Sequence, residues 1–370
     1  MVDLKTQYLH IKDEVDAAVA DVISSTRYIK GPNVEKFEDE LSQYLDVQHV
    51  IGCANGTDAL QIALMALDLQ PGDEVIVPSF TYVATAEVIG LLRLHPVMVD
   101  VDPHTFNVTA ETIEGAITSK TKAIVPVHLF GQSVHMDEIM DLAEKHNLFV
   151  IEDNAQAIGA TYSTKNRKNR KTGTMGHIGC TSFFPSKNLG CFGDGGAIFT
   201  NDDRLSAKIK MIANHGQSRQ YYHDVLGVNS RLDAMQAAIL RIKLLHLDHY
   251  CDMRRRAADQ YDDLFYSEKR ITVPFRASYT THVFHQYTLK VPPADREPLR
   301  EHLAALDIPS MVYYPVPLYK QKAYAPFCSP DMRLENTEAL CASVMSLPMH
   351  TEMTPKLTEY IGEGVLSYFS

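Results

Sequence analysis

Apolar side chains recur at close to helical spacing in residues 8–24, at Leu9, Ile11, Val15, Ala18, Val19, Val22 and Ile23. Because positions three and four apart share one face of a helix, this spacing predicts an amphipathic helix. Gly31-Pro32 then interrupts the chain, and the pattern over Val34–Tyr44 predicts another helix. The chain is therefore expected to open with two helices.

Short apolar runs alternate with helical patterns from residue 50 onwards. The runs predict strands at 50–53, 74–77, 96–100, 123–128 and 148–153, and the patterns between them predict helices at 57–67, 84–92 and 136–146. Thr57 is expected to cap the first of these helices or to lie in its first turn. Strands that alternate with helices over this length indicate an α/β domain with a mainly parallel sheet.

The pattern changes near residue 247. A helix predicted at 235–247 carries an apolar stripe, whereas the next helix, at 252–265, is more charged. A strand-like segment at 282–291 and a helix at 297–306 follow, with Pro298 near the first position of that helix. We therefore expect a large domain over 1–247 and a smaller C-terminal domain over 248–370.

The composition is that of a folded globular protein. Hydrophobic residues make up 45% of the 370 residues, which is enough for a sizeable core and excludes disorder of the whole chain. The formal charge of −11 argues against binding to nucleic acid or to a membrane surface, since both need a basic face. The first residues lack the pattern of a signal peptide, and no apolar run approaches about 20 residues. A cytoplasmic location is expected.

The cysteines, the histidines and one basic run indicate no site of their own. None of the six cysteines lies in a C-x-x-C pair and none of the sixteen histidines in H-E-x-x-H spacing, so we expect reduced, buried thiols and no metal site. The basic run 165–171 could bind phosphate, but the tip of a solvated hairpin is the favoured interpretation.

Lys187 stands between an aromatic stretch, Phe183-Phe184-Pro185, and a glycine-rich turn at 190–196. Most lysines lie on solvated surfaces, so a lysine in these surroundings is either a buried structural cation or a Schiff-base lysine, whose amine must lose its proton to react. The glycine spacing matches neither G-x-G-x-x-G nor G-x-x-x-x-G-K-[ST]. Dinucleotide binding and a P-loop are therefore disfavoured.

Three other features become informative beside this lysine. Asp153 ends an apolar run, where an acid either caps the next segment or faces a ligand crevice. Asn55-Gly56-Thr57 opens a helix and is either an ordinary cap or an anion site. Tyr82 is either a core aromatic or a stacking face for a planar ring. Together the four features fit pyridoxal phosphate, with its phosphate at Thr57, its ring on Tyr82, its ring nitrogen at Asp153 and its aldehyde carbon on Lys187.

Several long motifs resemble one family, in the right order and over nearly the whole chain. They are Cys53–Leu60, Ile151–Ala157, Ser182–Gly190, Gly193–Gly196, Asn214–Gly216, Gly227–Ala238 and Tyr314–Pro317. On these motifs the chain is similar to the sugar aminotransferases of the DegT/StrS family. The resemblance implies the type I aminotransferase fold, like that of aspartate aminotransferase. In that fold a large domain holds a mainly parallel sheet and pyridoxal 5'-phosphate, and the smaller C-terminal domain is α+β.

The resemblance also implies roles around the cofactor. Lys187 would bond to the aldehyde carbon, Asp153 would pair with the ring nitrogen, and Gln156 would lie near the phenolic oxygen of the ring. Gly56 and Thr57 would be joined by Ser182 at the phosphate.

Three further residues are implied at the borders of the site. Asn229 would reach the cofactor phosphate of a partner subunit, so that the active unit is a homodimer with shared sites. Arg231 would anchor a substrate carboxylate, the alternative being a surface or interface salt bridge. Lys30 resembles part of a loop near the nucleotide sugar, the alternative being a solvated lysine.

The implied reaction transfers an amino group from L-glutamate to a nucleotide-linked keto sugar in two half-reactions, with Lys187 as base and then acid. A related class of proteins has histidine in place of this lysine and dehydrates sugars, so Lys187 favours transamination. The motifs are most similar to members that aminate C3 of a UDP-linked 2-acetamido-3-keto-glucuronic acid for bacterial surface polysaccharides.

Two alternatives stay open. The glucuronate-specific members carry His-Tyr where this chain has Tyr313-Tyr314, in a substrate-facing segment, so dTDP-linked 3-keto-6-deoxyhexoses are the alternative substrates. A cofactor-binding regulator without catalytic activity is the third hypothesis. It is disfavoured because a binding module has no need for both Lys187 and Asp153.

Overall fold

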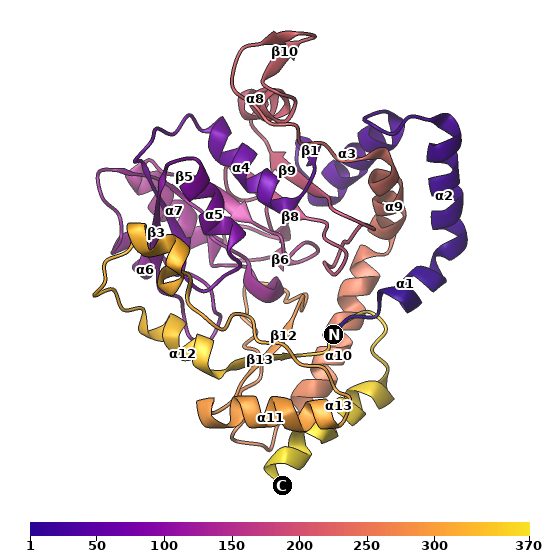
Figure 1. Ribbon diagram of the computed structural model, residues 1–370, viewed down its shortest axis with the longest axis vertical. Coiled ribbons are helices and arrows are strands. Elements are labelled where there is room, and N and C mark those ends of the chain that lie inside the picture. Colours follow the sequence, from indigo (N-terminus) through magenta and orange to yellow (C-terminus); the bar gives the residue numbers. More distant parts are fainter.

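The computed structural model describes every residue from Met1 to Ser370, and a seven-stranded sheet lies at the centre of its larger part (Figure 1). Across the sheet the strands are β1 (His49–Cys53), β9 (Gly196–Thr200), β8 (Ile178–Ser182), β5 (Phe149–Asp153), β4 (Thr121–Ile124), β2 (Glu74–Pro78) and β3 (His95–Val99). Strand β9 runs antiparallel to β1 and β8, and every other neighbouring pair is parallel. The predicted mainly parallel sheet is confirmed.

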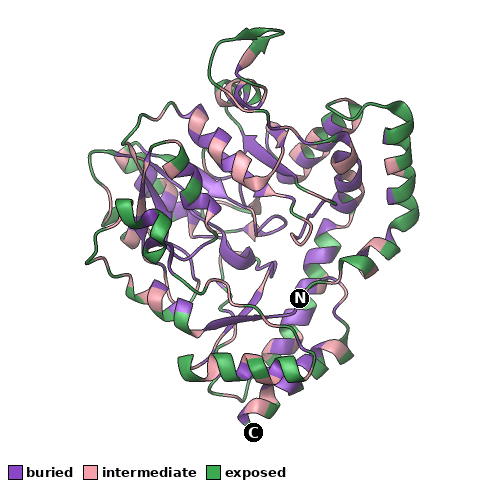
Figure 2. Cartoon of the chain, viewed as in Figure 1, coloured by how far each residue is buried: buried purple, intermediate pink, exposed green.

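Helices cover both faces of this sheet because its strands are apolar on both sides (Figure 2). Val75 and Val77 of β2 pack with α4 (Gly56–Ala66) and α5 (Ala84–Leu91), whereas Ile76 packs with α6 (Ala110–Glu114) and α7 (Met136–His146). Successive side chains of a strand point to opposite faces, which explains the alternation. The remaining helices before residue 247 are α1 (Leu4–His10), α2 (Lys12–Ser25), α3 (Pro32–Leu45), α8 (Asp203–Ala213) and α9 (Ala234–Leu245), with a 3-10 turn at η1 (Leu129–Gly131).

Two small antiparallel hairpins extend from this part of the molecule. Strands β6 (Thr161–Tyr162) and β7 (Arg170–Lys171) pair with each other and carry the basic run at their tip, as predicted. Strands β10 (Gln217–Arg219) and β11 (Tyr222–His223) form the hairpin that projects at the top of Figure 1.

The C-terminal residues form a separate core at the bottom of Figure 1. It is built from α10 (Leu247–Phe265), α11 (Pro293–Ala305), α13 (Pro355–Phe369) and the antiparallel pair β12 (Tyr287–Lys290) and β13 (Val344–Leu347). Between them, η2 (Leu318–Lys320), η3 (Lys322–Phe327) and α12 (Glu335–Ser343) pack against the cores of the larger part. A division at residues 247 and 248 would fall in the first turn of α10, and it stays a prediction.

Several element boundaries differ from the expected ones. The first helix is broken at Ile11, whose backbone (φ −119°, ψ 16°) leaves the helical region while its side chain packs with Val15 and Ile239. Helix α11 begins at Pro293, so Pro298 lies inside it and not near its start. Strands β4 and β12 are shorter than predicted, and α10 begins earlier. No helix combines the length and the apolar character that a membrane crossing requires.

Candidate active site

A cavity of about 660 Å³ lies at the carboxyl ends of the parallel strands β2, β4, β5 and β8. Ligands of open α/β sheets bind at this edge, because the loops that follow the strands converge there. Nine of the twelve predicted site residues line this cavity: Gly56, Thr57, Tyr82, Asp153, Gln156, Ser182, Lys187, Tyr313 and Tyr314.

The N-terminus of α4 forms one end of the cavity. Asn55 caps the helix by accepting a hydrogen bond from Asp58 N at 2.8 Å, so Thr57 lies in the first turn and is not the cap. Ser182, at the end of β8, lies directly against Gly56, where a Cβ would approach Ser182 Cβ to 2.7 Å. A helix N-terminus flanked by two hydroxyl groups is suited to a phosphate.

Asp153 ends β5, and its side chain is only 6% exposed. Its carboxylate accepts hydrogen bonds from Thr85 Oγ1 at 2.9 Å and from Ala155 N at 3.1 Å. Burial raises the pKa of Asp153, while these donors and the charge of Lys187 act in the opposite direction. Thr85 was missed as a partner of Asp153 because 68 residues separate the two in the chain.

Lys187 is half-buried in the cavity wall and forms no ion pair. Burial lowers the pKa of its amine to about 8, although the charge of Asp153 opposes the shift. The amine therefore loses its proton much closer to neutral pH than an exposed lysine does. Two cavity-lining side chains have a buried polar atom with no partner, Thr81 Oγ1 and His285 Nδ1, and neither was predicted.

An aromatic wall closes the side of the cavity next to Gln156. Gln156 Oε1 accepts a hydrogen bond from Phe130 N at 2.7 Å, and Gln156 Nε2 donates one to Tyr314 Oη at 3.1 Å. The rings of Phe130 and Tyr314 stack at 6.4 Å with an interplanar angle of 20°. Tyr82, 58% exposed, lies with its ring 6.5 Å from that of Tyr314. Burial raises the pKa of Tyr314, so its hydroxyl keeps its proton.

The other three predicted residues lie elsewhere on the chain. Lys30 and Arg231 line a separate pocket of about 240 Å³ together with Lys210. Asn229 is exposed and forms a backbone bridge with Asn214. Lys187 is consequently the one Lys or Arg side chain that lines the main cavity, beside the carboxylates of Asp58, Asp153 and Asp194. No group of three or more His, Cys, Asp or Glu side chains is arranged to hold a metal ion.

The sequence pattern of the DegT/DnrJ/EryC1/StrS aminotransferase family matches residues 9–366. The chain is 48% identical over 94% of its length to the UDP-2-acetamido-2-deoxy-3-oxo-D-glucuronate aminotransferase of Pseudomonas aeruginosa, of which 94% is covered. It is 43% identical over 100% of its length to the pleiotropic regulatory protein of Geobacillus stearothermophilus (98% covered). It is 41% identical over 94% of its length to the dTDP-3-amino-3,4,6-trideoxy-alpha-D-glucose transaminase of Streptomyces venezuelae (90% covered).

Solved structures agree with the sequence relatives. DesV from S. venezuelae, in complex with a ketimine intermediate, superposes with a TM-score of 0.94 at 39% identity, covering 99% of this chain and 97% of that chain. NtdA from Bacillus subtilis, with bound PMP, superposes with a TM-score of 0.89 at 32% identity, covering 96% of this chain and 81% of that chain. The fold is therefore that of the type I aminotransferases, as predicted.

The cavity fits the cofactor of these enzymes. Its anion-binding helix end, its buried carboxylate and its lysine with a lowered pKa are the three groups that pyridoxal phosphate requires at its phosphate, ring nitrogen and aldehyde carbon. The orphaned hydroxyl of Thr81 shows that the polar lining still has hydrogen-bonding capacity. The protein is a pyridoxal-phosphate-dependent aminotransferase, and the chain belongs to the DegT/DnrJ/EryC1/StrS aminotransferase family.

Proposed function

We propose that the protein transfers the amino group of L-glutamate to the C3 keto group of UDP-linked 2-acetamido-2-deoxy-3-keto-glucuronate, in the synthesis of a bacterial surface polysaccharide. The observation that carries an amino transfer is the common cavity of Lys187, Asp153, Thr57 and Ser182. The choice of sugar rests on the 48% identity to the P. aeruginosa enzyme named for this substrate. A cytoplasmic location belongs to the proposal, because six free thiols suit a reducing compartment.

The chain's own residues suit this reaction. When bound, pyridoxal phosphate supplies an electron sink for the carbon that loses its proton. Lys187 would hold the aldehyde carbon of the cofactor, and its amine would serve as the base and then the acid that moves a proton at the substrate carbon. An amine with a pKa of about 8 can act as the base near neutral pH. Asp153 would keep the ring nitrogen protonated, and Gln156 would bind near the phenolic oxygen of the ring.

The remaining cavity residues each bind a different part of the cofactor or border the sugar. Gly56 and Thr57, at the N-terminus of α4, hold the phosphate together with Ser182. Tyr82 offers its exposed ring as a stacking face. Tyr313 and Tyr314 border the space left for the sugar.

A homodimer with shared sites completes this proposal. The cofactor phosphate, L-glutamate and a nucleotide sugar are all anions, but one chain supplies its cavity with Lys187 alone as a cation. We infer that Asn229, Arg231 and Lys30 reach the cavity of a second copy. Arg231 would bind a carboxylate of the substrate and Lys30 would lie near the nucleotide.

One alternative substrate has support from a relative. The dTDP-sugar transaminase of S. venezuelae is 41% identical to this chain, which favours a dTDP-linked 3-keto-6-deoxyhexose as the second candidate. The third hypothesis, a regulator without catalytic activity, draws on the G. stearothermophilus relative named for regulation, but the family of the chain and its P. aeruginosa relative are aminotransferases. The presence of both Lys187 and Asp153 in the cavity supports catalysis over regulation alone.

The test is a panel of UDP- and dTDP-linked keto sugars with L-glutamate, in which 2-oxoglutarate release and product mass are measured. We expect turnover with the UDP-linked uronate and none with the Lys187→Ala variant, which should also lose the absorbance of the bound cofactor. Turnover of the dTDP sugars alone would establish the second candidate. A protein that binds the cofactor but converts no keto sugar would refute both enzymatic candidates.

A further inference from the structure

Glu152 is a carboxylate that the proposed reaction does not use, and its side chain is fully buried. It precedes Asp153 in β5, so the two neighbouring side chains point to opposite faces of the sheet. The core contacts of the strand agree, because Ile151 packs with residues of α4 and α5 whereas Val150 packs with residues of α7. Glu152 therefore points away from the cavity that Asp153 lines.

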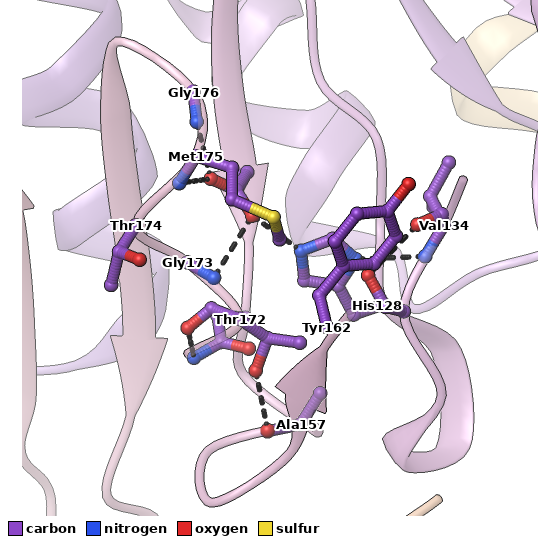
Figure 3. Close-up of polar contacts among 12 residues, drawn as sticks. His128, Val134, Ala157, Tyr162, Thr172, Gly173, Thr174, Met175 and Gly176 are labelled. Atoms are coloured by element: carbon purple, nitrogen blue, oxygen red, sulfur yellow. Dashed lines mark hydrogen bonds and ion pairs between the residues drawn. The ribbon is translucent and has the colours of Figure 1, made fainter. Parts of the chain in front are cut away.

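Four N–H groups converge on this carboxylate. Backbone N–H groups of Gly173 and Met175 donate to it at 2.9 and 2.6 Å, Gly176 N–H donates as well, and His128 Nε2 lies at 2.8 Å. Figure 3 shows His128 and the residues of the turn 173–176. Burial acts to raise the pKa of Glu152, but His128 and the backbone N–H groups of the turn act against burial and hold that pKa below its usual value. The carboxylate is ionised.

The position of the proton on His128 follows from its second nitrogen. Val134 N–H donates to Nδ1 at 3.1 Å, so Nδ1 is an acceptor and the ring proton lies on Nε2, toward Glu152. The imidazole is consequently neutral, and the pair carries one net negative charge. Both side chains are fully buried. Such a charge is costly to bury, even with four donors around it.

The segments that hold this pair also support the segment that carries Asp153 and Gln156. The backbone N–H of His128 donates to Asp153 O at 3.0 Å. The turn that binds Glu152 is joined to the segment after Asp153 through Thr172. The carbonyl of Thr172 accepts a hydrogen bond from Asn154 Nδ2 at 3.0 Å, and its Oγ1 donates one to Ala157 O at 2.7 Å. The segment of His128 and the turn 173–176 therefore hold the carboxylate of Glu152 on the side of β5 opposite to the side chain of Asp153.

We propose that Glu152, held by His128, is a positioning residue that acts through Asp153. It fixes the strand end that carries Asp153 and adds a second negative charge behind it, which favours a protonated ring nitrogen in the bound cofactor. The proposal rests on the proposed pairing of Asp153 with that nitrogen. A ring nitrogen that keeps its proton makes the cofactor a better electron sink.

The test uses the full-length protein loaded with pyridoxal phosphate labelled with ¹⁵N in its ring, because the NMR shift of that nitrogen reports its protonation. The Glu152→Gln variant keeps the shape of the side chain and removes its charge. We expect the ring-nitrogen signal to move toward the unprotonated form at neutral pH. We also expect kcat to fall about tenfold, with KM for L-glutamate changed less than about threefold. An unmoved signal together with an unchanged kcat would overturn the proposal.

A matched control distinguishes an effect of the charge of Glu152 from an effect of the structural support that the turn provides. Thr172→Val removes the hydrogen bond to Ala157 O from the same turn without changing any charge. It should lower the melting temperature of the apoprotein and leave the ring-nitrogen signal in place. If it moves the signal as far as Glu152→Gln does, Glu152 has only a structural role and the proposal is wrong.

Two further variants keep the proposal testable if Glu152→Gln does not fold. His128→Leu removes one donor from Glu152 and favours its protonated form, so it should move the signal in the same direction, whereas His128→Gln, which can still donate, should not. Asp153→Asn tests the proposed function itself. A signal unmoved by Asp153→Asn would refute the proposed pairing, while a signal moved by Asp153→Asn but not by Glu152→Gln or His128→Leu would refute only the role of Glu152.

Discussion

Gln156 Nε2 donates a 3.1 Å hydrogen bond to Tyr314 Oη, across 158 residues of sequence. The bond joins the loop after β5 to a segment of the C-terminal part that packs beside Phe130. Because Gln156 Oε1 is already bound to Phe130 N, the amide of Gln156 is held at both ends. The orientation of a predicted cofactor-binding residue thus depends on Tyr314.

The Tyr314→Phe variant should bind the cofactor more weakly. It removes the acceptor of Gln156 Nε2, and one hydrogen bond contributes about 1 kcal/mol, so we expect the Kd of the apoprotein for pyridoxal phosphate to rise about fivefold. An absorbance titration measures this. Tyr313→Phe is the matched control, since Gln156 makes no hydrogen bond to Tyr313, and its Kd should match that of the unmodified protein. Equal Kd values for both variants and the unmodified protein would contradict the role of Tyr314.

The lowered pKa of Lys187 predicts how the apoprotein takes up its cofactor. Only the neutral amine attacks an aldehyde, and burial brings the pKa to about 8. The rate of cofactor incorporation, followed by stopped-flow absorbance, should rise about tenfold per pH unit below pH 8 and level off above it. A rate that keeps rising to about pH 10 would mean that Lys187 has the pKa of an ordinary exposed lysine.

A complementation experiment tests the proposed shared sites. Lys187→Ala and Arg231→Ala are each expected to abolish turnover as homodimers. In a mixed dimer, one site combines the intact Lys187 of one chain with the intact Arg231 of the other. Random mixing of equal amounts should restore about a quarter of the unmodified activity, because half of the dimers are mixed and half of their sites are intact. Mixtures that stay inactive would indicate that both residues act within one chain.

Lys243→Met should stabilise the apoprotein. Lys243 is 1% exposed, forms no ion pair, and lies over the ring of Phe192 at 5.4 Å. Burial lowers the pKa of its amine from 10.5 to about 8. Below pH 8 the amine is charged in both the folded and the unfolded states, so folding bears the full cost of burying it. At pH 7 we expect the free energy of unfolding in urea to increase by about 1–3 kcal/mol.

The pH dependence of the increase in the free energy of unfolding provides the control for Lys243→Met. Between pH 8 and 10.5 only the unfolded chain retains the proton of Lys243, so the stability of the unmodified protein relative to the variant should recover progressively as the pH rises. Above that range both states are neutral and the gain should disappear. A gain that is constant from pH 7 to 10 would point to altered packing around Phe192 in place of a buried charge.

Much of the candidate active site could be predicted because its parts are local in the chain. The N-terminus of α4 was recognisable from Asn55-Gly56-Thr57, and Asp153 from its position at the end of a buried strand. These features follow from short-range capping and from strand alternation, which neighbouring residues dictate. The convergence of four such parts on one cofactor then indicated the chemistry of Lys187.

Two helix boundaries were predicted wrongly, one beside a distant contact and one beside a second proline. Ile11 continues a helical pattern, yet its packing against Ile239 accompanies a break in the helix. Pro298 is typical of a helix start, but α11 extends back to Pro293, where another proline supplies the first turn. The contact of Ile11 with Ile239 lies outside any local window, whereas Pro293 is itself a local signal for the start of α11.

The order of amino acids alone thus determined the alternation of strands and helices, the mainly parallel sheet and the lysine on which the proposed chemistry depends, because each follows from periodicity or from the nature of a side chain. Only the tertiary structure decided what surrounds these groups. It brings Thr85 to Asp153 and Tyr314 to Gln156, leaves Arg231 and Lys30 in a different pocket, and sends Glu152 and Asp153 to opposite sides of one strand. Burial and hydrogen bonding between distant segments then set the pKa values of Lys187 and Glu152, which no local sequence pattern encodes.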